Sequence, residues 1–222
     1  MLEVNSSQRN YLVAGSTGLI GNLLTEQLVK SNNKVIALTR HELSSNNDLL
    51  FFQKIDFENE ESFKDKFIGI SDAFICLGST IKKAGSQENF RKIDVDYCFS
   101  LAKAASMAKV PNLSIVTSIG ADSGSNNFYL KCKGEIEDKI SELDFKSLSI
   151  YRPGLLIGAR EEKRLGESVG QLLQPWLIDP LLRGSANKYR SVKGIDLANS
   201  LMEYSGKQQG KKFYYFEDLI RS

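Results

Sequence analysis

Short apolar runs alternate with helical patterns along the first two thirds of the chain. The runs have the length and composition of buried strands, and six of them precede residue 155: 11–15, 34–39, 51–55, 72–78, 113–118 and 147–154. Between them, apolar residues recur at helical spacing over 19–29, 87–108 and 127–143. Because strands that alternate with helices pair in parallel and carry helices on both faces, the pattern predicts an α/β fold with a doubly wound parallel sheet.

The part of the chain after residue 154 holds fewer strands. Its predicted elements are two helices and a late strand, over 166–173, 195–204 and 211–216. No internal repeat or low-complexity linker divides the sequence. We therefore expect one domain over residues 1–222, with a core over 1–154 and a small C-terminal extension over 155–222.

Charge and hydropathy exclude several classes of protein. With 29 basic and 27 acidic residues among 222, the net charge is only +2, and no basic stripe of the kind that binds nucleic acid is present. No window approaches the roughly 18 apolar residues of a membrane span, and the first residues have neither the basic head nor the apolar stretch of a targeting signal. We therefore expect neither a nucleic-acid nor a membrane partner, and a cytoplasmic location.

The cysteines agree with that location. Cys76, Cys98 and Cys132 are odd in number and lack C-x-x-C spacing, and the chain has one histidine. Neither a disulfide framework nor a zinc site is therefore expected. Free thiols in a reducing compartment fit this pattern best.

A glycine-rich turn joins the first predicted strand to the first predicted helix. It has the pattern G-x-x-G-x-x-G and consists of Gly15, Ser16, Thr17, Gly18, Leu19, Ile20 and Gly21. At this position bare backbone lets a pyrophosphate approach the helix N-terminus, whose amides and dipole favour negative charge. The turn predicts that a Rossmann-type fold binds a dinucleotide through these residues, although glycines that serve only a tight turn would give the same pattern.

The end of the second predicted strand distinguishes the two nicotinamide dinucleotides. A carboxylate there accepts hydrogen bonds from the ribose hydroxyls of NAD, whereas a guanidinium pairs with the 2′-phosphate of NADP. This chain has Thr39, Arg40 and His41 at that position and no acid before Glu42. We predict NADP (NADPH) rather than NAD as the cofactor, with Arg40 at the 2′-phosphate; an exposed arginine without a ligand is the alternative. Asp56, just beyond the third strand, is placed to meet the adenine amine or to cap the following helix.

Tyr129 and Lys133 form a Y-x-x-x-K pair in the helix predicted over 127–143. One helical turn separates them, so both side chains lie on the same face. A second such pair, Tyr189 and Lys193, lies in a segment that reads as extended, where side chains four positions apart lie far from each other. The first pair is therefore the catalytic candidate, and a solvated surface helix is the alternative.

Ser118 ends the fifth predicted strand, eleven positions before Tyr129. Because parallel sheets bind ligands at the carboxyl ends of their strands, Ser118, Tyr129 and Lys133 are expected to converge. In carbonyl reduction the phenol would pass a proton to the carbonyl oxygen, the ammonium would lower the phenol pKa from its usual value of about 10, and the serine hydroxyl would orient the carbonyl. Lys133 could also hold the nicotinamide ribose, so Tyr129 and Lys133 are expected at the cofactor as well.

With these motifs the sequence resembles the atypical short-chain dehydrogenases/reductases, and in particular the HIV Tat-interactive protein oxidoreductase group and its bacterial relatives. The matching segments occur in order and are GSTGLIG (15–21), CLGST (76–80), IDVDY (93–97), TSIGAD (117–122), YLKCKGE (129–135) and YRPG (151–154). The resemblance implies an NADP(H)-binding Rossmann fold, the serine, tyrosine and lysine above as the catalytic set, and Arg40 toward the 2′-phosphate.

The resemblance also extends to the walls of the cleft. It implies that Leu77 and Gly78 line the cofactor and that the loop AREEKRLGE (159–167), with Arg164, folds over it; a solvated loop that touches nothing is the alternative. Two residues depart from the family pattern. Asp94 stands where related reductases often carry an asparagine that orders a proton-relay water, and His41 stands where some members have a second arginine.

The predicted function is NADP(H)-dependent reduction of a small carbonyl compound by a monomer or homodimer, with the C-terminal extension on the substrate side. A non-catalytic NADP(H)-responsive binding or regulatory protein is the main alternative, because Asp94 departs from the pattern and the extension offers little material for a specificity pocket. A nucleotide-sugar epimerase or dehydratase uses the same tyrosine and lysine but usually needs a larger substrate lobe, so it ranks third.

Overall fold

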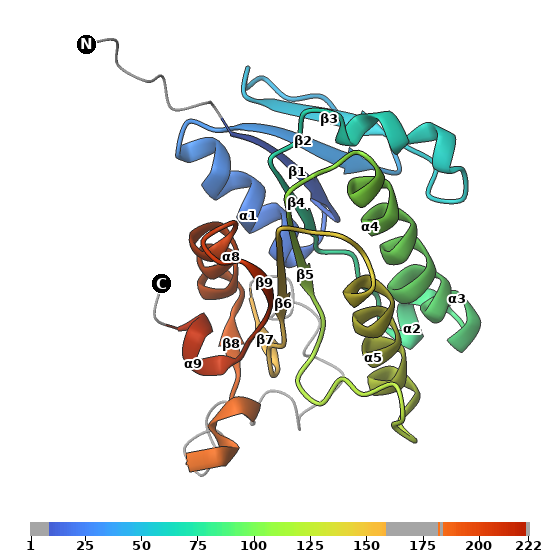
Figure 1. The fold of residues 1–222 in the computed structure, drawn as a ribbon, viewed down its shortest axis with the longest axis vertical. Helices are drawn as coiled ribbons and strands as arrows, with labels where there is room; N and C mark the ends of the chain where they lie inside the picture. Colours follow the sequence, from blue (N-terminus) through green and yellow to red (C-terminus); the bar gives the residue numbers. More distant parts are fainter. Residues whose placement is uncertain (1–8, 159–181, 183, 221–222) are drawn as a thin grey trace.

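The computed structural model describes residues 9–158, 182 and 184–220, and at its centre lies one parallel sheet (Figure 1). Seven strands lie in the order β3-β2-β1-β4-β5-β6-β9, and every adjacent pair is parallel. The strands are β1 (Asn10–Ala14), β2 (Lys34–Thr39), β3 (Leu50–Lys54), β4 (Asp72–Ile75), β5 (Asn112–Val116), β6 (Ser147–Tyr151) and β9 (Gly210–Tyr214). This sheet confirms the predicted doubly wound α/β fold.

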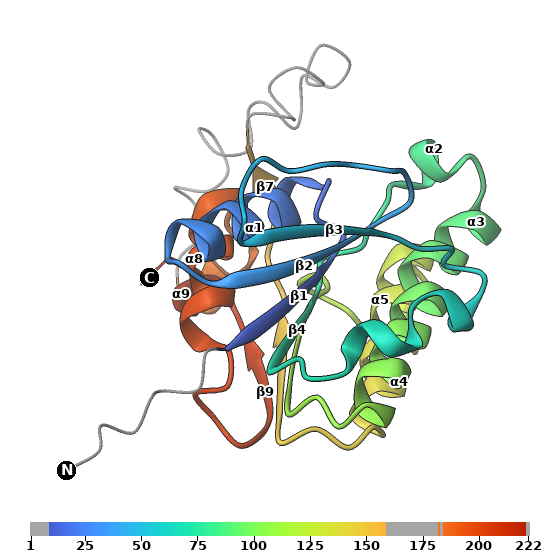
Figure 2. The ribbon, with the colours of Figure 1, turned by 90° about the horizontal axis from the view of Figure 1, so that it is seen from above.

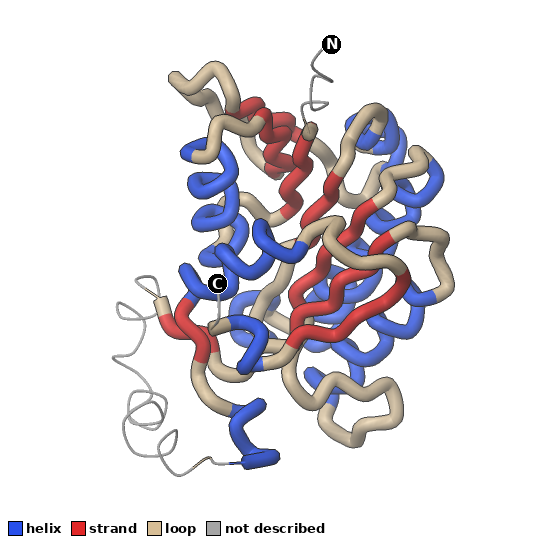
Figure 3. The backbone as a smooth tube through the Cα atoms, turned by 60° about the vertical axis from the view of Figure 1, so that its left-hand side comes forward, coloured by secondary structure: helices blue, strands red, loops and turns tan. Residues whose placement is uncertain are grey.

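Helices cover both faces of the sheet. α1, α8 and α9 lie on one face, and α4 and α5 lie on the other (Figure 1, Figure 2). Viewed from a third direction, the strands run side by side with the helices outside them (Figure 3). The helices are α1 (Leu19–Lys30), α2 (Ile81–Ala84), α3 (Gln87–Arg91), α4 (Cys98–Met107), α5 (Phe128–Ser141), α8 (Gly194–Tyr204) and α9 (Phe216–Leu219). Shorter turns are 3₁₀-helical at Glu60–Ser62, Lys64–Phe67 and Gly184–Tyr189, and π-helical at Lys92–Tyr97.

The alternation of side chains along the strands explains why both faces are covered. In β1, Leu12 and Ala14 join the apolar cluster under α4 and α5, whereas Tyr11 and Val13 join the cluster under α1 and α8. All four side chains are buried. A strand that is apolar on both faces must be covered on both sides, which a parallel sheet with crossover helices achieves.

Three strands end earlier than the sequence pattern predicts. β4 ends at Ile75, β5 at Val116 and β6 at Tyr151, whereas the apolar runs predicted strands to 78, 118 and 154. The first residues after β4 and β5 still donate their amides to a neighbouring strand: Cys76 to the Ala14 carbonyl and Thr117 to the Tyr151 carbonyl, both at 2.8 Å. The residues beyond them form loops at the carboxyl edge of the sheet. The predicted helix over 87–108 contains α3, the π-helical turn and α4 in succession, and the predicted helix over 166–173 lies outside the described residues.

Much of the segment after residue 154 belongs to the core. α8 packs against α1, and β9 extends the sheet beyond β6. A separate two-stranded sheet joins β7 (Leu156–Ile157) to β8 (Val192–Lys193). The extension therefore completes the core as well as contributing a wall of the cleft described below.

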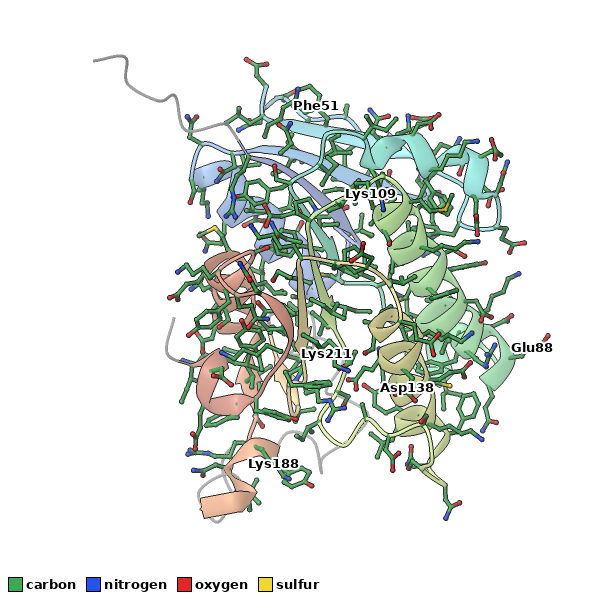
Figure 4. The ribbon with its side chains drawn as sticks, in the orientation of Figure 1. Phe51, Glu88, Lys109, Asp138, Lys188 and Lys211 are labelled. Atoms are coloured by element: carbon green, nitrogen blue, oxygen red, sulfur yellow. The ribbon has the colours of Figure 1, made fainter. Side chains whose placement is uncertain are left out.

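Charged side chains contribute to the outer surface. Glu88 on α3, Asp138 on α5 and Lys188 are exposed (Figure 4). At the open edge of the sheet, the Lys34 ammonium covers the ring of Phe51 on β3 at 4.9 Å from its centre. Within the described ranges, no helix combines the length and apolar character needed to cross a membrane.

Candidate functional site

The turn between β1 and α1 requires glycine at two positions. Gly15 has a φ of +85°, and a Cβ there would lie 2.6 Å from the backbone carbonyl carbon of Cys76. A Cβ at Gly21 would lie 2.2 Å from the carbonyl oxygen of Gly15. The missing side chains let α1 pack directly on the turn and let the turn pack on the end of β4.

The N-terminus of α1 can receive an anion. Gly18 is the N-cap and has no side chain that could accept a hydrogen bond from the first-turn amides. A cavity borders Gly15, Thr17 and Gly18 at this point. Backbone amides and the helix dipole therefore face open space that fits a pyrophosphate.

Three adjoining cavities form a cleft along the carboxyl ends of the strands. The inner cavity (about 250 Å³) lies between the glycine turn and α5, the middle cavity (about 230 Å³) follows the ends of β1, β2 and β4, and the outer cavity (about 750 Å³) opens beyond β2 and β3. Lys83 lines all three. Because β1 lies between β2 and β4, the cleft opens where the strand order reverses, which is where open parallel sheets bind ligands.

The outer end of the cleft carries the residues predicted for the adenosine half of a dinucleotide. Arg40 is exposed and lines both the middle and the outer cavity. Asp56 lines the outer cavity, and its Oδ1 accepts a hydrogen bond from the amide of Glu58 at 2.9 Å. The cap of the next 3₁₀ turn is Asn59 instead, whose side chain accepts from the Glu61 amide. Asp56 thus stabilises its own turn at the edge of the cavity.

Tyr129 and Lys133 meet at the inner end. α5 begins directly after Asn127, whose side chain accepts a hydrogen bond from the amide of Leu130 at 3.1 Å. One turn apart on this helix, Tyr129 and Lys133 both line the inner cavity, and the Lys133 Nζ lies 5.9 Å from the centre of the Tyr129 ring. Leu77 and Gly78 line the inner and middle cavities across from them.

The Lys133 ammonium forms a buried ion pair. Its Nζ lies 2.7 Å from the Oδ1 of Asp94, and the side chains are 7% and 0% exposed. Burial lowers the pKa of Lys133, but the charge and hydrogen bond of Asp94, together with Tyr129 and Cys98, outweigh it, so that the Lys133 pKa is raised above its usual value. The lysine therefore stays charged across the working pH range.

Ser118 is not among the described residues that line the cavity shared by Tyr129 and Lys133. Its Oγ donates a hydrogen bond to the carbonyl of Ile119 at 3.3 Å, and it is absent from the described residues that line the three cavities. Thr117 lines the inner cavity, and its hydroxyl donates to Glu137 at 2.5 Å. The structure thus brings Tyr129 and Lys133 together and places Thr117, rather than Ser118, on the cavity wall.

Several residues of the cleft were not predicted as site residues from the sequence. The rings of Phe57 and Tyr97 stack at 5.5 Å between centres and line the middle and outer cavities. They come from a loop after β3 and from the π-helical turn, so only the fold brings them together. Lys83 comes five residues after the strand predicted over 72–78, and this position after a strand end is the sequence feature that points to the cleft. Arg164 lies outside the described residues.

The cysteines near the cleft are neutral thiols. Cys76, Cys98 and Cys132 are all free. Burial raises the pKa of both Cys76 and Cys98 to about 12, which makes them poor nucleophiles. Among the described residues, no group of three or more histidine, cysteine, aspartate or glutamate side chains could hold a metal ion.

Glu137 fixes the orientation of α5. It is 4% exposed, and it accepts hydrogen bonds from Arg152 beyond β6, with Nε at 3.0 Å, and from Thr117 beyond β5. We expect Glu137→Ala to lower the free energy of unfolding by about 3 kcal/mol, because it leaves the Arg152 charge without its partner. Urea denaturation measures this change. The exposed neighbour serves as the control: Asp138→Ala should stay within about 0.5 kcal/mol of the wild type, and equal losses in both variants would contradict this role of Glu137.

Comparison with known proteins agrees with the geometry of the cleft. The sequence model of the NAD(P)H-binding family matches residues 15–164, beginning at the glycine turn. Protein HTATIP2 of Rattus norvegicus is 31% identical over 206 residues, which cover 90% of this chain and 85% of that protein. The chain belongs to the NAD(P)H-binding family, in the HTATIP2 group. Protein FMP52, mitochondrial, of Candida albicans is 34% identical over 180 residues, which cover 78% of each chain.

Solved structures of other proteins share the fold of this NAD(P)H-binding protein. The UDP-Glc/GlcNAc 4-epimerase of Campylobacter jejuni superposes with a TM-score of 0.70 at 13% identity and covers 96% of this chain and 82% of its own. MoeE5 in complex with UDP-glucuronic acid and NAD superposes with a TM-score of 0.68 at 16% identity, and the match covers 95% of this chain and 80% of MoeE5. At such identities the likeness shows the fold alone. Family membership confirms the resemblance that the ordered motifs indicated.

Proposed function

We propose that this protein reduces a small carbonyl compound with NADPH. The observation that carries the proposal is the continuity of the cleft, which runs from Arg40 at its outer end, past the glycine turn, to Tyr129 and Lys133 at its inner end. A guanidinium at the adenosine end favours a 2′-phosphate. A phenol beside an ammonium at the other end suits proton transfer to a carbonyl oxygen.

NADPH, when bound along this cleft, supplies the hydride. The Tyr129 phenol donates its proton to the carbonyl oxygen while the carbonyl carbon is reduced, and an alcohol results. The Lys133 ammonium holds its place beside the ring and stabilises the negative charge that the phenol oxygen acquires. For Ser118 to orient the substrate, its hydroxyl must turn away from the Ile119 carbonyl.

The walls of the inner cavity favour a small substrate. Leu19, Val116 and Leu156 form its apolar side, while Thr80 and Thr117 contribute hydroxyl groups. The described residues enclose about 250 Å³ here, part of which the reacting end of the cofactor must occupy, and this size favours a compact molecule. A short aldehyde, ketone or quinone fits this description.

The direct test is turnover. Purified protein is mixed with NADPH and a panel of aldehydes, ketones and quinones, and consumption of NADPH is followed by its absorbance. We expect at least one compound to be reduced and the matching alcohol or quinol to form. Binding of NADPH without reduction of any compound would contradict the reductase and favour the second candidate below.

Arg40 should set the preference for NADPH. We expect Arg40→Ala to weaken NADPH binding about tenfold or more while leaving NADH binding nearly unchanged, because only NADPH carries the 2′-phosphate that a guanidinium binds. Calorimetric titration measures both affinities. Lys54→Ala is the matched control, since Lys54 is another basic residue of the outer cavity and pairs with Glu42 at 3.5 Å. Equal losses for the two cofactors in Arg40→Ala would argue against this role.

A second candidate is a non-catalytic protein that reports the NADP redox state to a partner. One observation in its favour is the pairing of Lys133 with Asp94, whose negative charge offsets that of the ammonium. Another is that the Ser118 hydroxyl donates its hydrogen bond to the Ile119 carbonyl of the protein itself. Such a protein must differ in conformation between its NADP⁺ and NADPH forms. Hydrogen exchange around the cleft compares the two forms, and identical protection in both would remove this candidate.

The proposed location is the cytoplasm. The proposal rests on the balanced charge and the free thiols. The relatives named FMP52 are described as mitochondrial, so location is open to a direct check. A fluorescent fusion expressed in the native host should be diffuse, and co-localisation with a mitochondrial marker would overturn the proposal.

A further inference from the structure

Asp94 is a fully buried carboxylate at the reacting end of the cleft. It lies in the π-helical turn Lys92–Tyr97, between α3 and α4, and its side chain is 0% exposed. π-helical turns inside α-helices often occur at functional sites, because the extra residue redirects side chains. Here the turn presents Asp94 to the inner cavity, opposite α5.

The two oxygens of Asp94 hold two different parts of the site. Oδ1 lies 2.7 Å from the Lys133 Nζ, and Oδ2 accepts a hydrogen bond from the backbone amide of Ser79 at 2.9 Å. Ser79 follows Gly78, and a Cβ at Gly78 would lie 3.6 Å from Oδ1 and 3.9 Å from the Lys133 Nζ. The loop that lines the inner and middle cavities therefore passes directly against the ion pair.

The direct contact differs from a water relay. At 2.7 Å the carboxylate and the ammonium are within hydrogen-bonding distance, so no water fits between them on this line. Asp94 therefore contacts Lys133 directly, at a position where the resemblance implies an asparagine that orders a proton-relay water. It holds the lysine itself.

We propose that Asp94 is a positioning residue, which fixes Lys133 as an ammonium and ties it to the loop along the cofactor cleft. The proposal rests on the proposed function, since it concerns the lysine at the reacting end of NADPH. A buried lysine without an anionic partner tends to lose its proton, because burial penalises the charged form. Asp94 prevents this and also couples the lysine to the Gly78–Ser79 loop.

Other titratable groups near the pair do not replace Asp94. The groups that face it come from α4, α5, α2 and the end of β4 and are Cys98, Tyr129, Cys132, Lys83 and Cys76. Burial raises the pKa of both Cys98 and Cys76 to about 12, so neither supplies an anion at neutral pH. Among the residues that the structure describes, Asp94 is therefore the carboxylate on which the charge of Lys133 depends.

The test is the pH dependence of NADPH affinity in Asp94→Asn, which keeps the size of the side chain and removes its charge. The comparison is made in a Tyr129→Phe background, so that ionisation of that phenol does not contribute. With Asp94 present, affinity should stay level from neutral to alkaline pH. With asparagine, the Lys133 pKa falls, and we expect NADPH affinity to drop about tenfold as the pH rises through the lowered value. Calorimetry supplies the affinities without a known substrate.

Asp96→Asn is the matched control. Asp96 lies two residues further along the same π-helical turn and pairs with Arg91 at 3.0 Å, away from the cleft. The pH dependence of NADPH affinity in Asp96→Asn should match that of the Tyr129→Phe protein in which both variants are made. If NADPH affinity in Asp94→Asn did not change between neutral and alkaline pH, the proposal would be overturned. Failure of the wild type to bind NADPH at any pH would instead overturn the proposed function, and this inference with it.

Asp94→Asn can also fail to fold, since it leaves a buried ammonium without its partner. In that case the double variant Asp94→Asn with Lys133→Met decides the question, because it removes both charges. Recovery of most of the wild-type Tm supports the direct pair. A double variant as unstable as the single one would overturn the proposal, because Asp94 would then act on the fold through contacts other than Lys133.

Discussion

Gly21→Ala should abolish NADPH binding and lower the free energy of unfolding by at least about 4 kcal/mol. A Cβ at this position would lie 2.2 Å from the carbonyl oxygen of Gly15 and 2.7 Å from its carbonyl carbon. Both are backbone atoms of the turn, so neither can rotate away. α1 must then move off the turn, and the amides at its N-terminus no longer face the cleft. Urea denaturation and calorimetric titration measure the two effects.

The control for this change is Gly124→Ala. A Cβ at Gly124 would meet only the side chain of Asp122, with Oδ1 at 3.4 Å, and this side chain can move. The variant should retain NADPH affinity and lose less than about 1 kcal/mol of stability. If Gly21→Ala folded and bound NADPH as the wild type does, the close packing of α1 on the turn would be wrong.

Tyr129→Phe should reduce carbonyl turnover by about 10² to 10⁴-fold, the range over which a positioned proton donor accelerates a reaction. The ring remains in place against Phe90, at 5.7 Å between centres, so the fold and NADPH affinity should change little. Only the hydroxyl that supplies the proton is lost. Single-turnover measurement with a compound identified in the substrate panel separates this chemical step from binding.

Tyr97→Phe removes a hydroxyl from another tyrosine of the same cleft. The Tyr97 hydroxyl donates to Glu58 at 2.9 Å, and its ring lines the middle and outer cavities. Turnover should therefore persist in this variant. Comparable turnover in the wild type and Tyr129→Phe would rule out Tyr129 as the proton donor.

Local patterns in the sequence were sufficient to locate the scaffold of the cleft. The strand predicted over 34–39 has the bounds of β2, and the glycine turn joins β1 to α1 as its pattern indicates. Tyr129 and Lys133 share a face of α5 because helical spacing fixes their relation. These features depend on neighbours within a few residues, which the sequence displays directly.

The remaining features depend on contacts between distant segments. Asp94, which pairs with Lys133, lies in a π-helical turn, and the apolar spacing over 87–108 does not distinguish that turn from a regular helix. The choice of Thr117 over Ser118 on the cavity wall depends on where β5 stops pairing with β6. Likewise, β9 extends the sheet through partners in β6, about 60 residues earlier in the chain.

The most direct test of the account is a calorimetric titration of the wild-type protein with NADPH and, separately, with NADH. The cleft with Arg40 at its outer end predicts saturable binding of NADPH at one site, at least about tenfold tighter than NADH. Absence of binding by either cofactor would contradict the dinucleotide site itself. Equal affinities for the two would contradict the assignment of Arg40 to the 2′-phosphate and, with it, the preference for NADPH.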